Sequence, residues 1–223
     1  MSTMPTRSEF LFGRALPLGA YGLLIYIQGT LAIDGLQHAL AGQTDRATTM
    51  YLVNRILTLL FFSFLFAIYI VRSRAVGKDH SVGAVATAMF GTLVLYSLWL
   101  LPAPRTDNLY LLATSDILLS CGMLLAVYSV SYLRHRFSVV PEARGLVTTG
   151  PYALVRHPIY LGEIVAALGL ILPSYASFQL VIFVLFVAAQ LRRTAYEESV
   201  LRKSFPEYAA YAARTRRLIP FVL

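Results

Sequence analysis

The sequence predicts an all-α protein, a polytopic membrane helical bundle with four spanning helices, a C-terminal helical hairpin and a cytoplasmic tail. Of the 223 residues, 57% are hydrophobic and 13% are charged, which lies outside the usual range of soluble domains. The mean hydropathy of +0.65 agrees with this class. The apolar residues also gather in windows of about 20, the helix length that crosses a hydrocarbon core. We therefore expect an integral membrane protein.

Four windows are long and apolar enough to be expected as spanning helices: Ala15 to Ile33, Leu52 to Val71, Val82 to Leu101, and Leu111 to Leu133. The first window lacks a small-residue cleavage pattern after it, so we expect it to remain in the mature protein. The lone Cys121 lies inside the fourth window, and we interpret it as a small buried hydrophobic residue.

A further apolar stretch runs from Ile159 to Leu191 and is interrupted by Pro173-Ser174-Tyr175. Each half is shorter than a comfortable span, and one long helix would have to absorb a proline near its middle. We interpret the stretch as a tight hairpin that starts and ends on one side of the membrane. A single kinked helix stays open as the alternative.

The basic residues indicate the orientation. With the hairpin drawn, all but three of the 19 Lys and Arg fall on one side, the exceptions being Arg46, Arg55 and Arg105. The positive-inside bias makes this side cytoplasmic, so both termini are expected in the cytoplasm, at the inner membrane if the source is bacterial. The net charge of +8 then serves insertion and attraction to membrane lipids, and no nucleic-acid partner is expected. His38 and His80 lack metal-ligand spacing, so we expect no metal site.

The polar segment before the last apolar stretch carries signals for a turn and a helix start. Gly150-Pro151 marks a turn, and Pro158 suits the first turn of a helix, where its missing N–H is no loss. Free N–H groups at this helix start, with Arg156 and His157, make an anion-binding corner at the membrane surface. Gly162 on the new helix allows close approach of a second helix or a cofactor.

If the hairpin is correct, Glu197 and Glu198 return beside Arg156 and His157, which gathers acids, bases and tyrosines around one pocket. The alternative interpretation is interfacial anchoring by Arg, Tyr and Glu, which a membrane boundary also favours. The residues alone leave both interpretations open.

The motifs, taken in order, resemble a known family. They are Gly150-Pro151-Tyr152, Arg156-His157-Pro158-x-Tyr160-x-Gly162, Glu197-Glu198, and Tyr208-x-x-Tyr211-x-x-Arg214 followed by Pro220-Phe221. This pattern, over residues 147–221, resembles the isoprenylcysteine carboxyl methyltransferase family and its bacterial membrane relatives. The resemblance implies methyl transfer from S-adenosyl-L-methionine to a lipophilic acceptor, a small molecule or a prenylated chain, that enters from the bilayer.

The Arg-His-Pro-x-Tyr-x-Gly element also occurs in membrane sterol reductases, so an NADPH-dependent sterol or lipid reductase is the alternative. No Gly-x-Gly-x-x-Gly follows a strand, so a nucleotide-like cofactor would be bound by other means. We expect residues 1–133 to supply transmembrane helices. Residues 134–223 would form the cofactor-binding loop, the hairpin and the tail of the same compact unit.

The resemblance also implies roles for individual residues. It assigns the cofactor to a set centred on one helix start, namely Tyr152, Val155, His157, Pro158, Tyr160, Gly162 and Glu198. These types suit a methionine carboxylate, ribose hydroxyls or an amino group, and a sulfonium against a tyrosine ring. The candidate catalytic residues are Arg156 and Arg214, as a clamp for a carboxylate acceptor, and Glu197, which would help to deprotonate a thiol or an amine.

Overall fold

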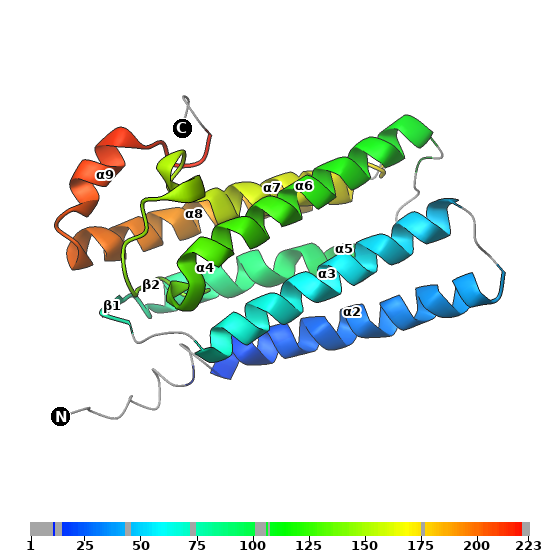
Figure 1. Cartoon of the computed structure of the whole chain (residues 1–223), viewed down its shortest axis with the longest axis horizontal. Coiled ribbons are helices and arrows are strands. Elements are labelled where there is room, and N and C mark those ends of the chain that lie inside the picture. The colour runs from blue at the N-terminus through cyan, green and yellow to red at the C-terminus, as the bar shows by residue number, and fades with distance from the viewer. Residues whose placement is uncertain are drawn as a thin grey trace. The chain divides into compact units, whose positions relative to one another are not determined.

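The computed structural model describes residues 15–42, 46–71, 75–100, 108–174 and 177–219, together with Leu11 and Thr106. Nearly all of this part is helical (Figure 1). Three helices are long and apolar enough to cross a membrane, namely α2 (Leu16–Leu40), α6 (Leu109–Leu133) and α8 (Ser177–Ser204). The all-α class and the presence of membrane-length apolar helices are therefore confirmed. The chain divides into two compact units, residues 1–71 and 72–223.

The first unit is an antiparallel pair of helices, α2 and α3 (Arg46–Val71). The rings of Tyr21 and Tyr69 meet edge to face with their centroids 6.0 Å apart, and Arg55 Nη1 donates to Gln28 Oε1 at 3.3 Å. An arginine inside an apolar helix needs such a polar partner. Within the described residues, the apolar stretch of α3 covers only Arg55–Ala67, so α3 is not one of the three candidate spans.

The expected span from Val82 to Leu101 is not confirmed, because the helical run over residues 82–100 changes geometry after Leu93. Ser81 caps α4 (Val82–Leu93), which is followed by a 3₁₀ turn, η2 (Val94–Tyr96), and the short α5 (Ser97–Leu100). The hydroxyls of Thr92 and Ser97 donate back to carbonyl oxygens of the preceding turn, which tightens or bends a helix. The 12 residues of α4 by themselves rise about 18 Å, and α4 is one of the shorter apolar helices and not one of the three candidate spans.

The closest helix packing of the second unit joins α6 to α7 (Pro158–Ile171), which lie side by side in Figure 1. A Cβ on Gly162 would lie 2.6 Å from Gly122 O, and a Cβ on Gly169 would lie 2.6 Å from Ser115 O. Ser115 Oγ also donates to Gly169 O at 2.7 Å. Small residues therefore let the two backbones touch, as is common between membrane helices.

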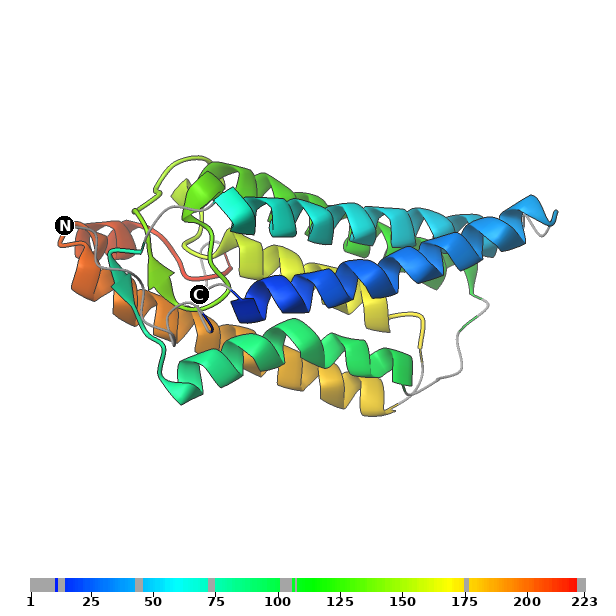
Figure 2. The ribbon, with the colours of Figure 1, turned by 90° about the horizontal axis from the view of Figure 1, so that it is seen from below.

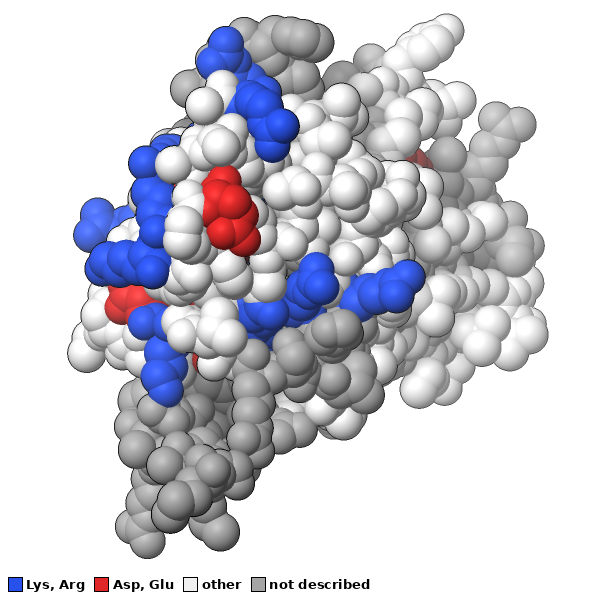
Figure 3. All heavy atoms as spheres, turned by 60° about the vertical axis from the view of Figure 1, so that its left-hand side comes forward, with Lys and Arg blue, Asp and Glu red and all other residues white. Residues whose placement is uncertain are grey.

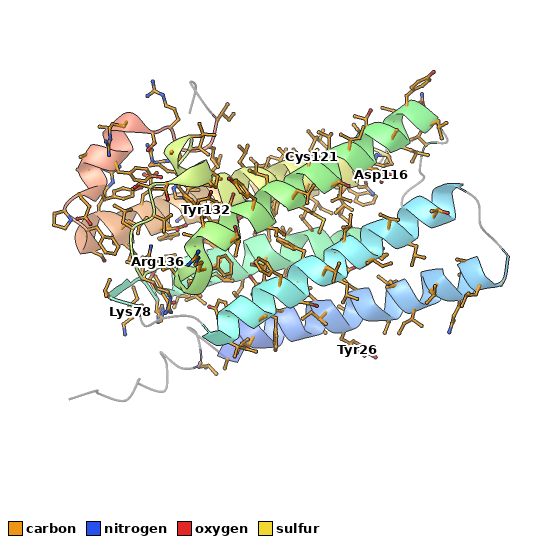
Figure 4. All side chains as sticks on the ribbon, in the orientation of Figure 1. Tyr26, Lys78, Asp116, Cys121, Tyr132 and Arg136 are labelled. Carbon is orange, nitrogen blue, oxygen red and sulfur yellow. The ribbon has the colours of Figure 1, made fainter. Side chains whose placement is uncertain are left out.

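The face of α6 opposite this contact behaves differently. Cys121, expected to be buried, is exposed there. Leu124 on the same helix is 66% exposed, so this face is apolar and open to the surroundings. Figure 4 labels Cys121 on α6.

Helix α8 returns along α7 and is longer than the half-hairpin expected to end at Leu191. It continues to Ser204 because residues beyond Leu191 remain helical and partly buried, among them Arg193, Thr194 and Glu198. Its other neighbour is α4, beside which it runs in Figure 2. The second half of α8 thereby lies beside the start of α7.

Short elements connect these helices at one end of the second unit. Strands β1 (Gly77–Lys78) and β2 (Glu142–Ala143) form an antiparallel pair, and 3₁₀ turns η3 (Arg134–Arg136) and η4 (Gly150–Ala153) lie between α6 and α7. Glu142 accepts hydrogen bonds from Ser138 at 2.7 Å and Arg144 at 2.5 Å and contacts His80 at 2.9 Å. The tail forms α9 (Tyr208–Arg214), and Pro220-Phe221 lies outside the described residues.

Candidate functional site

The tail holds the segment that precedes α7. Val155 pairs with Arg216 in a parallel bridge, Arg156 N donates to Arg216 O at 2.7 Å, and His157 N donates to Arg217 O at 3.1 Å. The tail therefore lies directly against the segment that leads into α7. Pro158 occupies the first turn of α7 and is fully buried, as its fixed φ and missing N–H allow.

Glu198 is the centre of the site. Its Oε1 accepts from Arg156 Nε at 2.8 Å and from Arg217 Nε at 3.2 Å, and it lies 3.2 Å from His157 Nε2. Its Oε2 accepts from Arg217 Nη2 at 3.1 Å and from Arg202 Nη2 at 3.4 Å. Glu198 is only 3% exposed, so this carboxylate ties together the segment before α7, helix α8 and the tail. Charge-assisted bonds of this kind are among the strongest in proteins.

Glu197 differs from its neighbour in being accessible, with 32% of its side chain exposed. Tyr160 donates its hydroxyl to Glu197 Oε2 at 3.1 Å, and His157 Nδ1 lies 3.7 Å from the same oxygen. The rings of His157 and Tyr160 lie 5.6 Å apart. His157 therefore stands between the two glutamates, with one ring nitrogen near each.

A second polar network lies against Tyr160. The Arg193 guanidinium stacks on the Tyr160 ring at 4.9 Å and donates to Gln190 Oε1 at 2.8 Å. Gln190 donates in turn to Glu163 on α7, whose carboxylate lies 3.8 Å from Arg193 Nη1. A cation of the protein thus already contacts the ring that was expected to meet a sulfonium.

Two buried tyrosine hydroxyls have no hydrogen-bond partner among the described residues, those of Tyr152 and Tyr208. Burial raises the pKa of Tyr152, and the charge of Glu197 raises it further. Burial and then the charge of Glu198 raise the pKa of Tyr208. Because an unmade buried hydrogen bond costs about 1–3 kcal/mol, such hydroxyls in the field of two glutamates are suited to a polar ligand.

The structure brings five of the ten expected site residues into contact, namely Arg156, His157, Tyr160, Glu197 and Glu198. Arg156 is largely occupied by the fold, because its Nη1 donates to Ala212 O at 2.9 Å and also to Thr215 O.

Three other expected residues are placed differently. Gly162 was expected to allow close approach of a second helix or of a cofactor. The position that a Cβ would take on Gly162 faces α6, so the structure shows the helix contact. Val155 contributes backbone to the bridge with the tail. The side chain of Arg214 is exposed and makes no hydrogen bond or ion pair with the described site residues.

Sequence reasoning missed four residues that shape the site, namely Gln190, Arg193, Arg202 and Arg217. The arginines were counted only as orientation signals. For Gln190 and Arg193 the signal was their spacing. Gln190 lies two helical turns and Arg193 one turn before Glu197, so the three residues lie near one face of α8.

The segment that carries most of this site is similar to known proteins. Residues 110–208 match the family model described as phospholipid methyltransferase. The chain is 35% identical to the cobalt-zinc-cadmium resistance protein CzcN of Cupriavidus metallidurans over 146 residues. This match covers 63% of this chain and 64% of that protein. The chain is 37% identical over 79 residues to the nickel-cobalt-cadmium resistance protein NccN of Alcaligenes xylosoxydans xylosoxydans, covering 34% and 36%.

The family match includes the Arg-His-Pro element and the glutamate pair, and it confirms the resemblance to membrane methyltransferases predicted from the sequence. The chain spans less than two thirds of the length of both curated relatives.

Proposed function

We propose that this chain is an integral membrane methyltransferase that transfers a methyl group from S-adenosyl-L-methionine to a lipophilic acceptor. The observation that carries the proposal is the convergence of the family's motif residues on Glu198, where Arg156, His157 and the tail residue Arg217 meet. The comparisons give no support to a sterol reductase.

The residues around Glu198 fit such a cofactor chemically. Tyr152 and Tyr208 offer buried hydroxyls without a protein partner, and Glu197 offers an exposed carboxylate. In the described residues, the N–H groups of Ile159 and Tyr160 at the start of α7 have no acceptor, as expected for a helix start that receives a carboxylate. His157 and the start of α7 would hold the amino-acid portion, and the tyrosines would hold hydroxyl groups.

The cofactor supplies an activated methyl group on a sulfonium sulfur, and the protein needs to align that group with the acceptor. Alignment alone contributes about 7–11 kcal/mol in favourable systems. The network of Arg193, Gln190 and Glu163 fixes the ring of Tyr160, and Glu198 fixes His157. Glu197 is placed to accept a proton from a thiol or an amine acceptor, because its carboxylate is exposed whereas that of Glu198 is enclosed.

The membrane-length helices α2, α6 and α8 support a multi-pass location, and the excess of basic residues on one side supports cytoplasmic termini. The α7–α8 pair would form the hairpin that returns the site to the cytoplasmic face. A lipophilic acceptor would reach it sideways, from the hydrocarbon core. A prenylated chain and a small lipid both fit this description.

Thermal unfolding of the full chain in detergent tests the cofactor. We expect S-adenosylhomocysteine to raise the unfolding temperature in a concentration-dependent way and NADPH to leave it unchanged. Tyr208→Phe is the sharpest variant, because it removes a buried hydroxyl that has no protein partner. The apo protein should be as stable as the wild type or more so, while the response to S-adenosylhomocysteine weakens.

Two glutamate variants complete this test. Glu198→Gln should abolish the response, while Glu207→Gln, which makes the same chemical change at an exposed position, should retain it. Stabilisation by NADPH alone, or full responses in both Tyr208→Phe and Glu198→Gln, would reject the proposal. Membranes incubated with methyl-labelled cofactor would then identify the acceptor by the label.

A further inference from the structure

A polar pocket lies outside the site around Glu198, at the end of α6. Its volume is about 530 Å³, and its walls come from the last residues of α6, from η3 and from the loop before η4. The polar lining comprises Ser131, Tyr132, Arg134, Arg136, Thr148 and Thr149. None of the residues assigned above to the methyl-transfer site lines this pocket.

The two arginines of the pocket are not neutralised. Among the described residues, the side chains of Arg134 and Arg136 make no hydrogen bond or ion pair, whereas the side chain of Arg144 nearby is paired with Glu142. The Arg136 side chain lies against the backbone of Gly145, whose φ of +147° brings the loop close. Two guanidinium groups that line one pocket without a carboxylate partner suit an oxyanion, which can accept from both.

The hydroxyls of the lining strengthen this chemistry. Thr148 and Thr149 have no side-chain hydrogen bond among the described residues and are exposed within the loop. Hydroxyls of this kind supply donors that complement a guanidinium around a phosphate. No Asp or Glu lines the pocket, so it offers no partner for an ammonium group.

The place of the pocket in the fold argues for a lipid. It lies at the end of α6, a candidate membrane span whose outward residues are apolar, with Leu124 and Ile117 more than 60% exposed. Tyr128 and Tyr132, one turn apart near this end, are both exposed and join their hydroxyls at 3.2 Å. Such tyrosines mark the headgroup level of a bilayer. Figure 4 labels Tyr132 and Arg136 at this end of α6.

The surrounding surface has the same sign. Figure 3 shows Lys and Arg gathered on this end of the second unit, with few acidic residues among them. The exposed basic residues there include Arg202, Lys203, Arg214 and Arg216. They attract anionic lipids in general, whereas the described residues of the pocket combine two guanidiniums with hydroxyls in a concave site.

We propose that the pocket at the end of α6 binds the phosphate of a net-anionic phospholipid headgroup through Arg134 and Arg136. The phosphate would lie between the guanidiniums and the hydroxyls of Thr148 and Thr149, with the acyl chains along the exposed face of α6. A zwitterionic headgroup binds less well, because its ammonium finds no carboxylate in the pocket. The site is separate from the proposed methyl transfer and holds whether or not that proposal is correct.

Titration of the full chain in neutral detergent tests this site, with thermal unfolding or native mass spectrometry as the readout. The probes are phosphatidylglycerol, phosphatidylcholine with the same acyl chains, and inorganic phosphate. We expect phosphatidylglycerol to bind and stabilise more strongly than the other two. Arg134→Gln with Arg136→Gln should weaken its apparent Kd by about 30-fold, at about 5-fold for each charge near a membrane surface.

The matched control is Lys203→Gln with Arg216→Gln, which removes the same charge from exposed positions outside the pocket. It should change the apparent Kd several-fold less than the pocket variant. Arg134→Gln alone, which changes an exposed side chain, should weaken binding about 5-fold. If both double variants lost the same affinity for phosphatidylglycerol, binding would depend on general surface charge, and the proposed pocket site would be refuted. If inorganic phosphate stabilised the protein as strongly as phosphatidylglycerol, the proposal that the ligand is a lipid would be refuted. If phosphatidylcholine bound equally well, the proposed preference for a net-anionic headgroup would be refuted.

Discussion

Replacing Gly162 by alanine tests the link between helix packing and the site. The added Cβ would lie 2.6 Å from Gly122 O and 2.8 Å from Ala126 N. Both atoms belong to the backbone of α6, so no side chain can rotate away. Restoring an ordinary contact of about 3.4 Å requires α7 to move by about 0.8 Å.

The expected cost follows from two opposing effects. Overpacking of a rigid contact costs about 1–3 kcal/mol, while replacing glycine by alanine inside a helix gains about 0.5–1 kcal/mol. Gly162→Ala should therefore lower the stability by roughly 1–2 kcal/mol, or about 2–8 °C in unfolding temperature for a chain of this size. Because Tyr160 and His157 stand at the same end of α7, the shift should also weaken the response to S-adenosylhomocysteine.

Thermal unfolding in detergent measures this effect, with Gly29→Ala as the matched control. Gly29 lies inside α2, and a Cβ there would meet no heavy atom within 4 Å. The control should be as stable as the wild type or slightly more so. If Gly162→Ala behaved like Gly29→Ala, the close contact of α6 and α7 would be refuted, and with it the reasoning that ties Gly162 to helix packing.

Three further predictions concern stability. Hydrogen bonds and the neighbouring Arg144 outweigh the burial that would raise the pKa of Glu142, and they lower that pKa from 4.5 to about 2. Ionised Glu142 therefore contributes roughly 3 kcal/mol to the free energy of unfolding, fully above pH 4.5, and this contribution is lost as the pH falls toward 2. Glu142→Gln should make the unfolding temperature less dependent on pH over that window. Tyr211→Phe should cost about 1–2 kcal/mol in denaturant unfolding, because its hydroxyl donates to a buried carbonyl at 2.7 Å, and an unchanged midpoint would contradict this. Arg193→Met should cost about 3–5 kcal/mol by leaving the Glu163 carboxylate unpaired, and adding Glu163→Gln should restore part of the loss in a double-mutant cycle.

The start of α7 could be predicted because its signals are local. A proline in the first turn, a Gly-Pro turn before it and a glycine two residues after Tyr160 each restrict the backbone wherever they occur. Gly150 has a φ of +61°, which favours glycine, and it packs against the Tyr132 ring. Hydropathy likewise located α2 and α6, because it depends only on residue type and length.

The interruption after Leu93 could not be predicted in this way. The window up to Leu101 contains no charged residue, and the hydroxyls of Thr92 and Ser97 carry little weight in a hydropathy average. Two partners of Arg193 also lie outside its local sequence, since it donates to Val139 O and stacks on a ring of α7. Basic residues near a membrane boundary serve orientation in most positions, so only contacts between helices distinguish a site arginine from the rest.

The two adjacent glutamates show the same limit at the scale of one residue. Neighbours on an α-helix project about 100° apart, so Glu197 and Glu198 must face different surroundings. The sequence shows two acids in one motif and gives no rule for separating them. In the structure, Glu198 is enclosed by three arginines and a histidine, whereas Glu197 is 32% exposed and has one tyrosine hydroxyl on it. A carboxylate surrounded by cations binds protons weakly and serves to hold the segments together. The accessible neighbour is then the acid that remains for a ligand or a proton, and this is why we propose that Glu198 anchors the segments and that Glu197 takes part in the chemistry.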